Sequence, residues 1–219
     1  MDIFVEDGRT YFKLMDYKTG SKDLDPDQIR RGLQLQLITY MEALRQADTD
    51  LPAGMAAGGG QTVPSAMLYY RIYEPVLRVS PSEAAAALGP KDGDPEGAEE
   101  TNLDKVHRAL RPTGLVYGDD ENIMHLDRFF TGASSTIPVT RTSSGGYHAK
   151  SHMIGAEEYR DLARAAADAL CRIAADILDG NVTAAPAVID QDQTACDYCP
   201  FREACGFDLR IPGYERRRD

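Results

Sequence analysis

The sequence predicts a mixed α/β domain, in which a small mixed sheet is flanked by helices and followed by a short cysteine-containing appendage. Short apolar and aromatic segments have the density or alternation that is typical of strands. Two long segments repeat apolar residues every three or four positions, as amphipathic helices do. Three cysteines lie close together near the end of the 219-residue chain. This length suffices for one domain with a full core, or for one domain and a small appendage.

The first predicted element is a β-hairpin. Residues 3–5 and 10–17 have strand patterns, and between them Asp7-Gly8 is a turn signal. Side chains alternate between the two faces of a strand, so Asp16 and Lys18 fall on the same face as the apolar Leu14. A carboxylate and an ammonium group therefore follow directly on the apolar side of the second strand.

The next predicted element is a helix from Asp25-Pro26 to about Gln46, with Asp25 as N-cap and proline in the first turn. Gln36 is a polar residue within its apolar stripe, and Tyr40 lies one turn later on the same face. The remaining predicted elements are a flexible loop at 54–60, a buried strand at 66–72, a flexible insertion at 81–104, short helices at 105–111 and 120–130, and a long helix at 156–179.

The charge and hydropathy patterns limit the function classes. A formal net charge of −11 argues against a broad basic surface for nucleic acid, but not against a local basic groove. His148 and His152 flank Lys150 in a polar loop, which is either solvated or in contact with a DNA backbone. Apolar runs are all shorter than the roughly 20 residues that cross a bilayer, and the first residues lack signal-peptide features. We therefore expect no membrane association and a cytoplasmic location.

Asp16 and Lys18 allow two interpretations. In the first, the strand end simply reaches solvent and both charges are hydrated. In the second, the carboxylate binds a hard cation such as Mg²⁺, and the lysine stabilises the charge that develops on an attacked phosphate. Gln36 and Tyr40, taken alone, fit a core-edge amide and a core aromatic. A D-x-K pair at a strand end followed by Q-x3-Y on the next helix is much more specific, and favours a metal-dependent site.

These residues carry a resemblance to a known family. Asp16-Tyr17-Lys18-Thr19-Gly20, and the segment at 32–40 with the sequence GLQLQLITY, resemble the RecB-type nuclease motif of the PD-(D/E)XK superfamily. Within that superfamily the chain is most similar to the nuclease domains of AddB subunits, and the likeness runs nearly end to end. It implies a restriction-endonuclease-like core over residues 1–190, Asp16 as a Mg²⁺ ligand, Lys18 as the catalytic lysine, and Gln36 and Tyr40 along the path of a DNA strand.

The sequence departs from this family at its start. The family has a G-x-x-D-R-x-D segment just before the hairpin, and Met1-Asp2 matches only its last two positions. The first aspartate of that segment, the better candidate for a second metal ligand, would lie upstream of residue 1. We therefore expect an incomplete metal site and weak or no nuclease activity for these 219 residues alone.

The cysteine cluster comprises Cys196, Cys199 and Cys205, in a C-x2-C-x5-C pattern within residues 191–219. Spacing alone leaves zinc and a [4Fe–4S] cluster equally open. The resemblance implies the [4Fe–4S] cluster, since AddB-like nucleases combine this pattern with a fourth cysteine well upstream of the nuclease core. We expect that fourth ligand upstream of this chain, because Cys171 fits a small buried apolar residue in the helix at 156–179.

The function implied is Mg²⁺-dependent exonucleolytic cleavage of DNA strands in double-strand-break repair and recombination, within an ATP-dependent helicase–nuclease that also contains an AddA-like partner. The sequence itself has no P-loop, so the motor would belong to the parent assembly. The alternatives are a stand-alone Cas4-like exonuclease, a nuclease-fold module that holds DNA without cutting it, and a zinc-ribbon interaction module. The last of these leaves D-x-K and Q-x3-Y unexplained.

Overall fold

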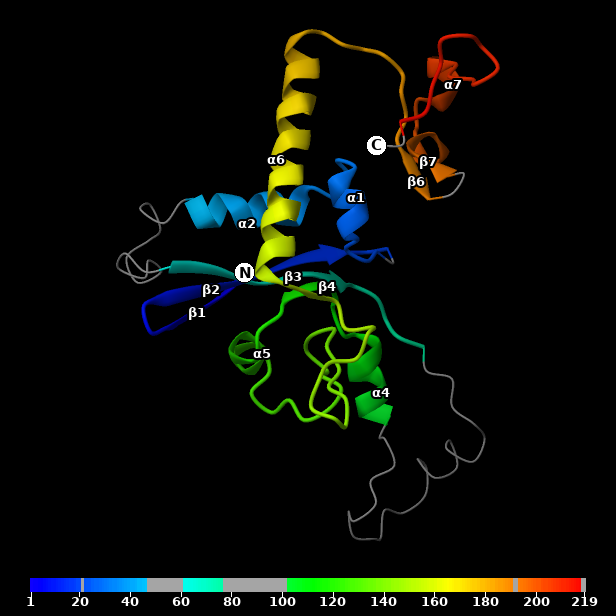
Figure 1. Cartoon of the computed structure of the whole chain (residues 1–219). Coiled ribbons are helices and arrows are strands. Elements are labelled where there is room, and N and C mark those ends of the chain that lie inside the picture. Colours follow the sequence, from blue (N-terminus) through cyan, green and yellow to red (C-terminus); the bar gives the residue numbers. More distant parts are fainter. Residues whose placement is uncertain (21, 47–60, 77–101, 191–192, 218–219) are drawn as a thin grey trace. The chain divides into compact units, whose positions relative to one another are not determined.

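The computed structural model describes residues 1–20, 22–46, 61–76, 102–190 and 193–217 (Figure 1). The loop predicted at 54–60 and most of the insertion predicted at 81–104 lie outside these residues. The chain divides into two compact units. One unit contains Met1–Asp23 and Asp48–Gly155, the other Leu24–Ala47 and Ala156–Asp219, and each is described by itself.

The first unit contains a mixed five-stranded sheet in the order β1-β2-β3-β4-β5, which confirms the predicted architecture. The strands are β1 (Asp2–Glu6), β2 (Arg9–Lys18), β3 (Gln61–Arg71), β4 (Thr113–Tyr117) and β5 (Met153–Ile154). Neighbours pair alternately antiparallel and parallel along this order, beginning with the antiparallel β1–β2 hairpin. At the hairpin turn Asp7 and Gly8 have φ values of 47° and 72°. Positive φ at both positions is what a two-residue type I′ turn requires, and Asp-Gly favours it.

One face of this sheet carries an apolar core that is covered by α5 (Asp120–Leu126) and the segment after it. The core consists of Ala66, Leu68, Val116, Ile123, Phe130, Ile137 and Val139. Asp119 caps the N-terminus of α5 through its side chain, which accepts a hydrogen bond from the Asn122 backbone N–H. Another short helix, α4 (Asn102–Ala109), precedes β4. Helices were predicted in both places.

A buried polar network joins α5 to the sheet. The register between β2 and β3 shifts between Phe12 and Lys13, and Ser65 is the extra residue on β3. Such a bulge leaves ladder groups without strand partners. Asn122, which is fully buried, supplies them: its Nδ2 donates to the carbonyl oxygens of Ser65 at 3.0 Å and Tyr117 at 2.7 Å, and its Oδ1 accepts from Ser65 Oγ.

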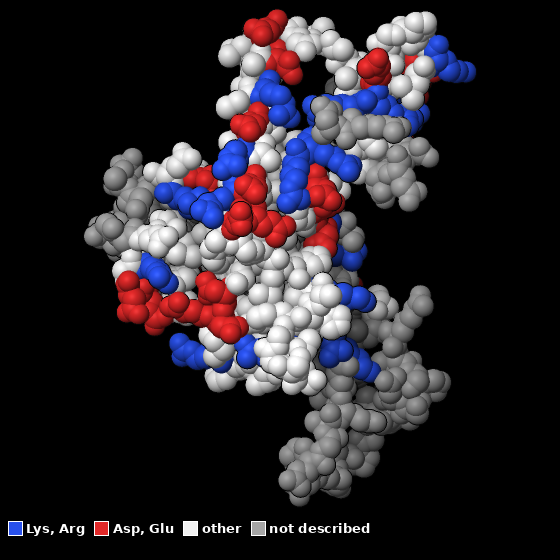
Figure 2. Space-filling view, viewed as in Figure 1, with Lys and Arg blue, Asp and Glu red and all other residues white. Residues whose placement is uncertain are grey.

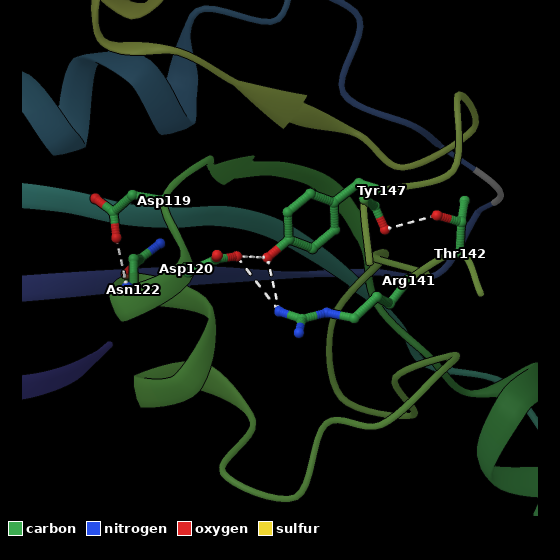
Figure 3. Close-up of polar contacts among 7 residues, drawn as sticks. Asp119, Asp120, Asn122, Arg141, Thr142 and Tyr147 are labelled. Atoms are coloured by element: carbon green, nitrogen blue, oxygen red, sulfur yellow. Dashed lines mark hydrogen bonds and ion pairs between the residues drawn. The ribbon is translucent and has the colours of Figure 1, made fainter. Parts of the chain in front are cut away.

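A second polar cluster attaches the segment at 131–151 to α5 (Figure 3). The carboxylate of Asp120 accepts hydrogen bonds from Tyr147 Oη and from Arg141 at 3.3 Å, and Arg141 also donates to Tyr147 Oη at 3.2 Å. The Tyr147 ring stacks on Phe130 of the core, with ring centroids 6.5 Å apart. Burial of Tyr147, with its hydrogen bond to Asp120, raises the pKa of the phenol above its ordinary value. The phenol therefore stays a hydrogen-bond donor at neutral pH.

In the second unit, the single helix predicted from Asp25 to about Gln46 is wrong. The structure has α1 (Pro26–Arg30) and α2 (Gln36–Gln46) with a break between them. Gly32 and Gln34 have φ values of 78° and 51°, which end a helix. The Gln34 side chain stabilises the break, because its Oε1 accepts from the Asp25 backbone N–H at 3.1 Å and its Nε2 donates to Gln28 Oε1 at 2.7 Å. The N-cap predicted at Asp25 is confirmed.

The long helix α6 (Ala156–Leu178) agrees with the prediction at both ends, and Gly180 follows it with φ 68°. A Cβ on Gly32 would lie 3.3 Å from the Cβ of Ala169, so the glycine lets the α1–α2 connection pack closely on α6. The buried residues of α6 end at Ala169. Beyond it the predicted apolar face is only partly covered, since Leu170 is 37% and Ile177 72% exposed.

The C-terminal segment forms a small two-stranded sheet, β6 (Val188–Asp190) and β7 (Gln193–Thr194), followed by the 3-10 helix η1 (Ala195–Tyr198) and α7 (Arg202–Cys205). Asp197 holds the start of η1 by accepting a hydrogen bond from the Thr194 backbone N–H at 2.8 Å. Across the described ranges, none of the helices has both the length and the apolar character needed to cross a membrane.

Candidate active site

Asp16 and Lys18 lie near the end of β2, where the strand extends past its β1 partner. The described part of β1 begins at Asp2, which pairs with Lys13, so the following residues of β2 are paired with β3 alone. In the parallel register Asp16 lies beside Tyr69, and Lys18 beside Arg71. This strand end belongs to an otherwise well-buried strand, and its polar side chains are held by a rigid element.

The two charged groups form a close ion pair, with Lys18 Nζ 2.5 Å from Asp16 Oδ2. Their side chains are only 26% and 24% exposed. The Oδ2 atom is buried and, among the described residues, receives no hydrogen bond of acceptable geometry, so the ion pair alone compensates it. A buried carboxylate oxygen without hydrogen bonds is costly. It is also an anionic oxygen ligand of the kind that hard divalent cations bind.

Tyr69 completes this part of the site. Its side chain is 4% exposed, and the Lys18 ammonium lies 5.1 Å from the centre of its ring. Burial, reinforced by the negative charge of Asp16, raises the pKa of the Tyr69 phenol above its ordinary value. The sequence prediction did not include this residue. Its strand was predicted, but only the register of a parallel pair with a distant segment identifies Tyr69 as the neighbour of Asp16.

Gln36 and Tyr40 lie on α2, one turn apart, and Gln36 Nε2 is 3.4 Å from Tyr40 Oη. The expectation that they share the apolar face of the helix is wrong. The buried residues of α2 are Leu37, Ile38 and Met41, whereas Gln36 is exposed and Tyr40 is 52% exposed. Their polar groups are therefore accessible together. Because α2 belongs to the second unit and Asp16 to the first, the predicted convergence of all four residues stays a prediction.

The cysteines give one correction. Cys171 is exposed on α6, not buried as predicted, because the covered stretch of this helix ends two residues earlier. Cys196 and Cys199 are half-buried and Cys205 is exposed, and all four cysteines are free thiols. Their sulfurs are not gathered as a group of three within 4.8 Å in the part of the chain that the structure describes. The cluster predicted for them stays a prediction.

One group of potential metal ligands does meet this distance: Glu6, Glu121 and His125. His125 Nε2 lies 2.7 Å from Glu6 Oε2, and Arg9 lies 3.5 Å from Glu121. The group is at the hairpin end of β2, about 23 Å along the strand from Asp16 at ~3.3 Å per residue. Ion pairs within the group already link the hairpin to α5, and it is separate from the Asp16–Lys18 site.

Comparison with known proteins identifies the family. A sequence model of the PD-(D/E)XK nuclease superfamily matches residues 1–206. The chain belongs to this superfamily. Asp16 and Lys18 have the spacing that the last part of the superfamily's name describes, an acidic residue two positions before a lysine. The expected PD-(D/E)XK nuclease fold is thereby confirmed.

This PD-(D/E)XK domain is also similar to longer proteins that are named as B-type subunits of ATP-dependent helicase/deoxyribonucleases. It is 29% identical to the one from Clostridium botulinum over 97% of this chain, 30% identical to that of Acetivibrio thermocellus over 94%, and 25% identical to that of Caldanaerobacter subterraneus over its full length. The matched region is only 16–17% of each relative. The chain thus spans about a sixth of the proteins that it matches, and the expected similarity to AddB-type proteins is confirmed.

Proposed function

We propose that this domain hydrolyses DNA phosphodiester bonds at the Asp16–Lys18 end of β2, with Mg²⁺ as its metal. The single observation that carries this proposal is the buried Asp16 Oδ2, which is compensated only by the adjacent Lys18 ammonium among the described residues. The residues fit a hard cation, because the site offers an anionic oxygen on a rigid strand. Bound Mg²⁺ would polarise the phosphate and lower the pKa of a coordinated water.

The protein groups have distinct roles in this proposal. Asp16 holds the cation at the strand end. Lys18 shifts from its ion pair with Asp16 towards the phosphate oxygens, where it stabilises the negative charge that builds up during in-line attack. Tyr69 limits the water around both groups, and its neutral phenol adds no competing negative charge. Gln36 and Tyr40, with accessible amide and phenol groups, line the path of the DNA strand.

The β1–β2 register supports the expectation of a second carboxylate. Asp2 pairs with Lys13 in an antiparallel strand pair. In a polypeptide that continues this strand upstream in the same register, the third residue before Asp2 faces Asp16. That is the position of the first aspartate in the family's G-x-x-D-R-x-D segment. Two carboxylates side by side on neighbouring strands would bind one cation between them.

The longer relatives suggest the setting of this activity. Their name combines a helicase and a deoxyribonuclease in one protein. We propose that the domain acts as an exonuclease in a cytoplasmic AddAB-type complex, on strands that an AddA-like partner helps to unwind during double-strand-break repair. Cys196, Cys199 and Cys205, with a fourth cysteine upstream of this chain, would bind a [4Fe–4S] cluster that fixes the C-terminal segment.

The test uses the longest polypeptide that the gene encodes around this chain. Release of acid-soluble nucleotides from linear DNA is measured with Mg²⁺, for the natural protein and for the variants Asp16→Asn and Lys18→Gln. Both variants are expected to lose at least ~100-fold in rate, as when one stabilising group of a polar active site is removed. The matched controls are Asp161→Asn and Arg164→Gln, an exposed ion pair on α6 that should leave the rate unchanged.

The substrate separates the alternatives. An exonuclease degrades linear strands and spares circular single strands, so cleavage of circles would contradict the exonuclease assignment. A polypeptide that binds DNA and cuts neither form with Mg²⁺ or Mn²⁺ would be a DNA-holding module instead. Iron and acid-labile sulfide in anaerobically prepared protein, with absorbance near ~400 nm, are expected for the cluster. Stoichiometric zinc in their place would contradict it.

A further inference from the structure

A pocket of about 650 Å³ in the first unit has an unusual lining for so acidic a chain. The charge of −11 includes only 24 Lys and Arg among 219 residues, and Figure 2 shows charges of both signs mixed over the side in view. Of the eleven residues that line this pocket, three are Lys or Arg and two are among the four histidines of the chain. The cationic residues are Arg108, Arg111 and Lys150, with His148 and His152 beside them, and Asp23 is the one carboxylate of the lining.

The pocket has a rigid wall. His148 donates a backbone hydrogen bond to the Thr140 carbonyl oxygen at 2.8 Å, and the Thr140 backbone N–H donates to Ser151 Oγ at 3.0 Å. The preceding Tyr147 is fixed to α5 by the Asp120–Arg141 cluster of Figure 3. Lys150 and both histidines are therefore presented by a segment whose backbone is already ordered, which reduces the entropy lost on binding.

The opposite wall is equally defined. Arg108 and Arg111 lie at the end of α4 and just after it, where Arg111 donates to the Ser134 carbonyl oxygen at 3.2 Å. Tyr73, which follows β3, donates to the Ala109 carbonyl oxygen at 2.8 Å and so attaches this end of α4 to the sheet. Two arginines on one side and a lysine with two imidazoles on the other face a common space.

The strand register relates this pocket to the proposed site. Asp16 pairs with Tyr69 on β3, and Tyr69 pairs with Thr113 on β4, which lines the pocket. Adjacent strands are about 4.8 Å apart, so Thr113 is about 10 Å from Asp16 between Cα atoms. Each strand of B-DNA advances about 3.4 Å per nucleotide. The pocket thus lies two to three nucleotides from a phosphate that is bound at Asp16.

We propose that this pocket binds the phosphate backbone of the DNA strand being cut, a few nucleotides away from the scissile phosphate. The cationic groups supply the electrostatic attraction that the rest of the acidic chain lacks, and arginine forks suit phosphate oxygens. The contacts are to phosphates, so binding is independent of base sequence. This inference rests on the proposed function, since DNA is the substrate assumed there.

The experiment measures binding of the full chain to a fluorescently labelled single-stranded oligonucleotide by anisotropy, in EDTA so that cleavage cannot occur. Arg108→Gln and Lys150→Gln are each expected to weaken binding about 3- to 10-fold at 100 mM salt, and more together. Each should also reduce the slope of log K against log salt by about 0.7, the value for one phosphate contact on a single strand. Arg128→Gln, an exposed charge of the same unit outside the pocket, is the control.

The outcomes distinguish this inference from the function on which it rests. If the control weakens binding as much as the pocket variants, or if the pocket variants leave both affinity and salt slope unchanged, the pocket assignment is wrong. The proposed function is then still supported as long as Asp16→Asn abolishes cleavage in the longer polypeptide. Conversely, pocket-dependent binding without any cleavage by that polypeptide would support the pocket and contradict the nuclease proposal. Unchanged circular dichroism confirms that the variants fold.

Discussion

Asn122 offers the sharpest test of the fold, because one fully buried amide satisfies several backbone and side-chain groups. Replacing it with alanine leaves the carbonyl oxygens of Ser65 and Tyr117 and the Ser65 hydroxyl without their partner. Each buried orphan costs about 1–3 kcal/mol, so the three together predict a loss of about 3–6 kcal/mol in the free energy of unfolding. This is at the upper end for a single substitution.

The measurement is urea unfolding followed by tyrosine fluorescence, since the chain has no tryptophan. With an m-value of about 2–3 kcal/mol/M, the midpoint of Asn122→Ala should fall by more than about 1 M. Ser65→Ala removes only the hydroxyl and should cost about 1–2 kcal/mol. Because the two residues share a bond, the double variant should lose less than the sum of the single losses.

The control is Asn181→Ala, which removes an exposed amide that donates to Asp176 at 3.0 Å just after α6. It should change stability by less than about 0.5 kcal/mol. If Asn122→Ala is no more destabilising than this control, the buried network does not hold the bulge of β3 to α5. Strict additivity of the Asn122 and Ser65 substitutions would also refute the reasoning.

Three further predictions concern stability. Gly114→Ala should lower the melting temperature by at least about 6 °C, because φ is +132° and a Cβ would lie 2.2 Å from the Met67 carbonyl oxygen, whereas Gly132→Ala, with open space around its Cβ, should change it by under about 2 °C; equal shifts would contradict the clash. Tyr159→Phe removes a 2.6 Å hydrogen bond to a carboxylate and should cost about 1–2 kcal/mol at pH 7. Burial raises the pKa of the Tyr159 phenol, so this contribution is complete below pH ~10 and is lost as the pH rises further; urea midpoints between pH 7 and 11 should show the difference from the natural chain shrinking, and a constant difference would argue against it. Lys13→Met should cost under about 1 kcal/mol at pH 7. The Lys13 hydrogen bond holds the pKa of Asp2 below its ordinary value, so the cost should disappear as the pH falls below about 4, and its persistence at pH 2 would contradict the pairing.

Local patterns were sufficient to predict most of the helices and strands. The hairpin turn, the cap at Asp25 and the stop at Gly180 each depend on residues next to one another in sequence, and all three are found. The break at Gly32 was missed because the apolar period continues through it. Its cause is tertiary, the close approach of Ala169 from a helix more than a hundred residues later.

The candidate site shows the same limit. The D-x-K spacing identifies Asp16 and Lys18 from sequence alone, and the shared turn identifies Gln36 and Tyr40. Tyr69 could not be found in this way, because its place beside Asp16 depends on the register of a parallel pair. The basic pocket is assembled from four short segments at 23, 108–113, 138–140 and 148–152, none of which is strongly basic by itself. Overall composition argued against DNA binding for that reason.

The parallel pairing of β2 with β3 also has a kinetic consequence. It joins residues about fifty positions apart, with α1 and α2 in the intervening chain, whereas the β1–β2 hairpin needs only neighbours. Closing a long loop is slower than closing a short one, so the hairpin should form first and β3 should dock on it later. Tyr69 reaches Asp16 only at that later step. A newly made chain would therefore acquire its complete strand end, and any capacity to cut DNA, among the last events of its folding.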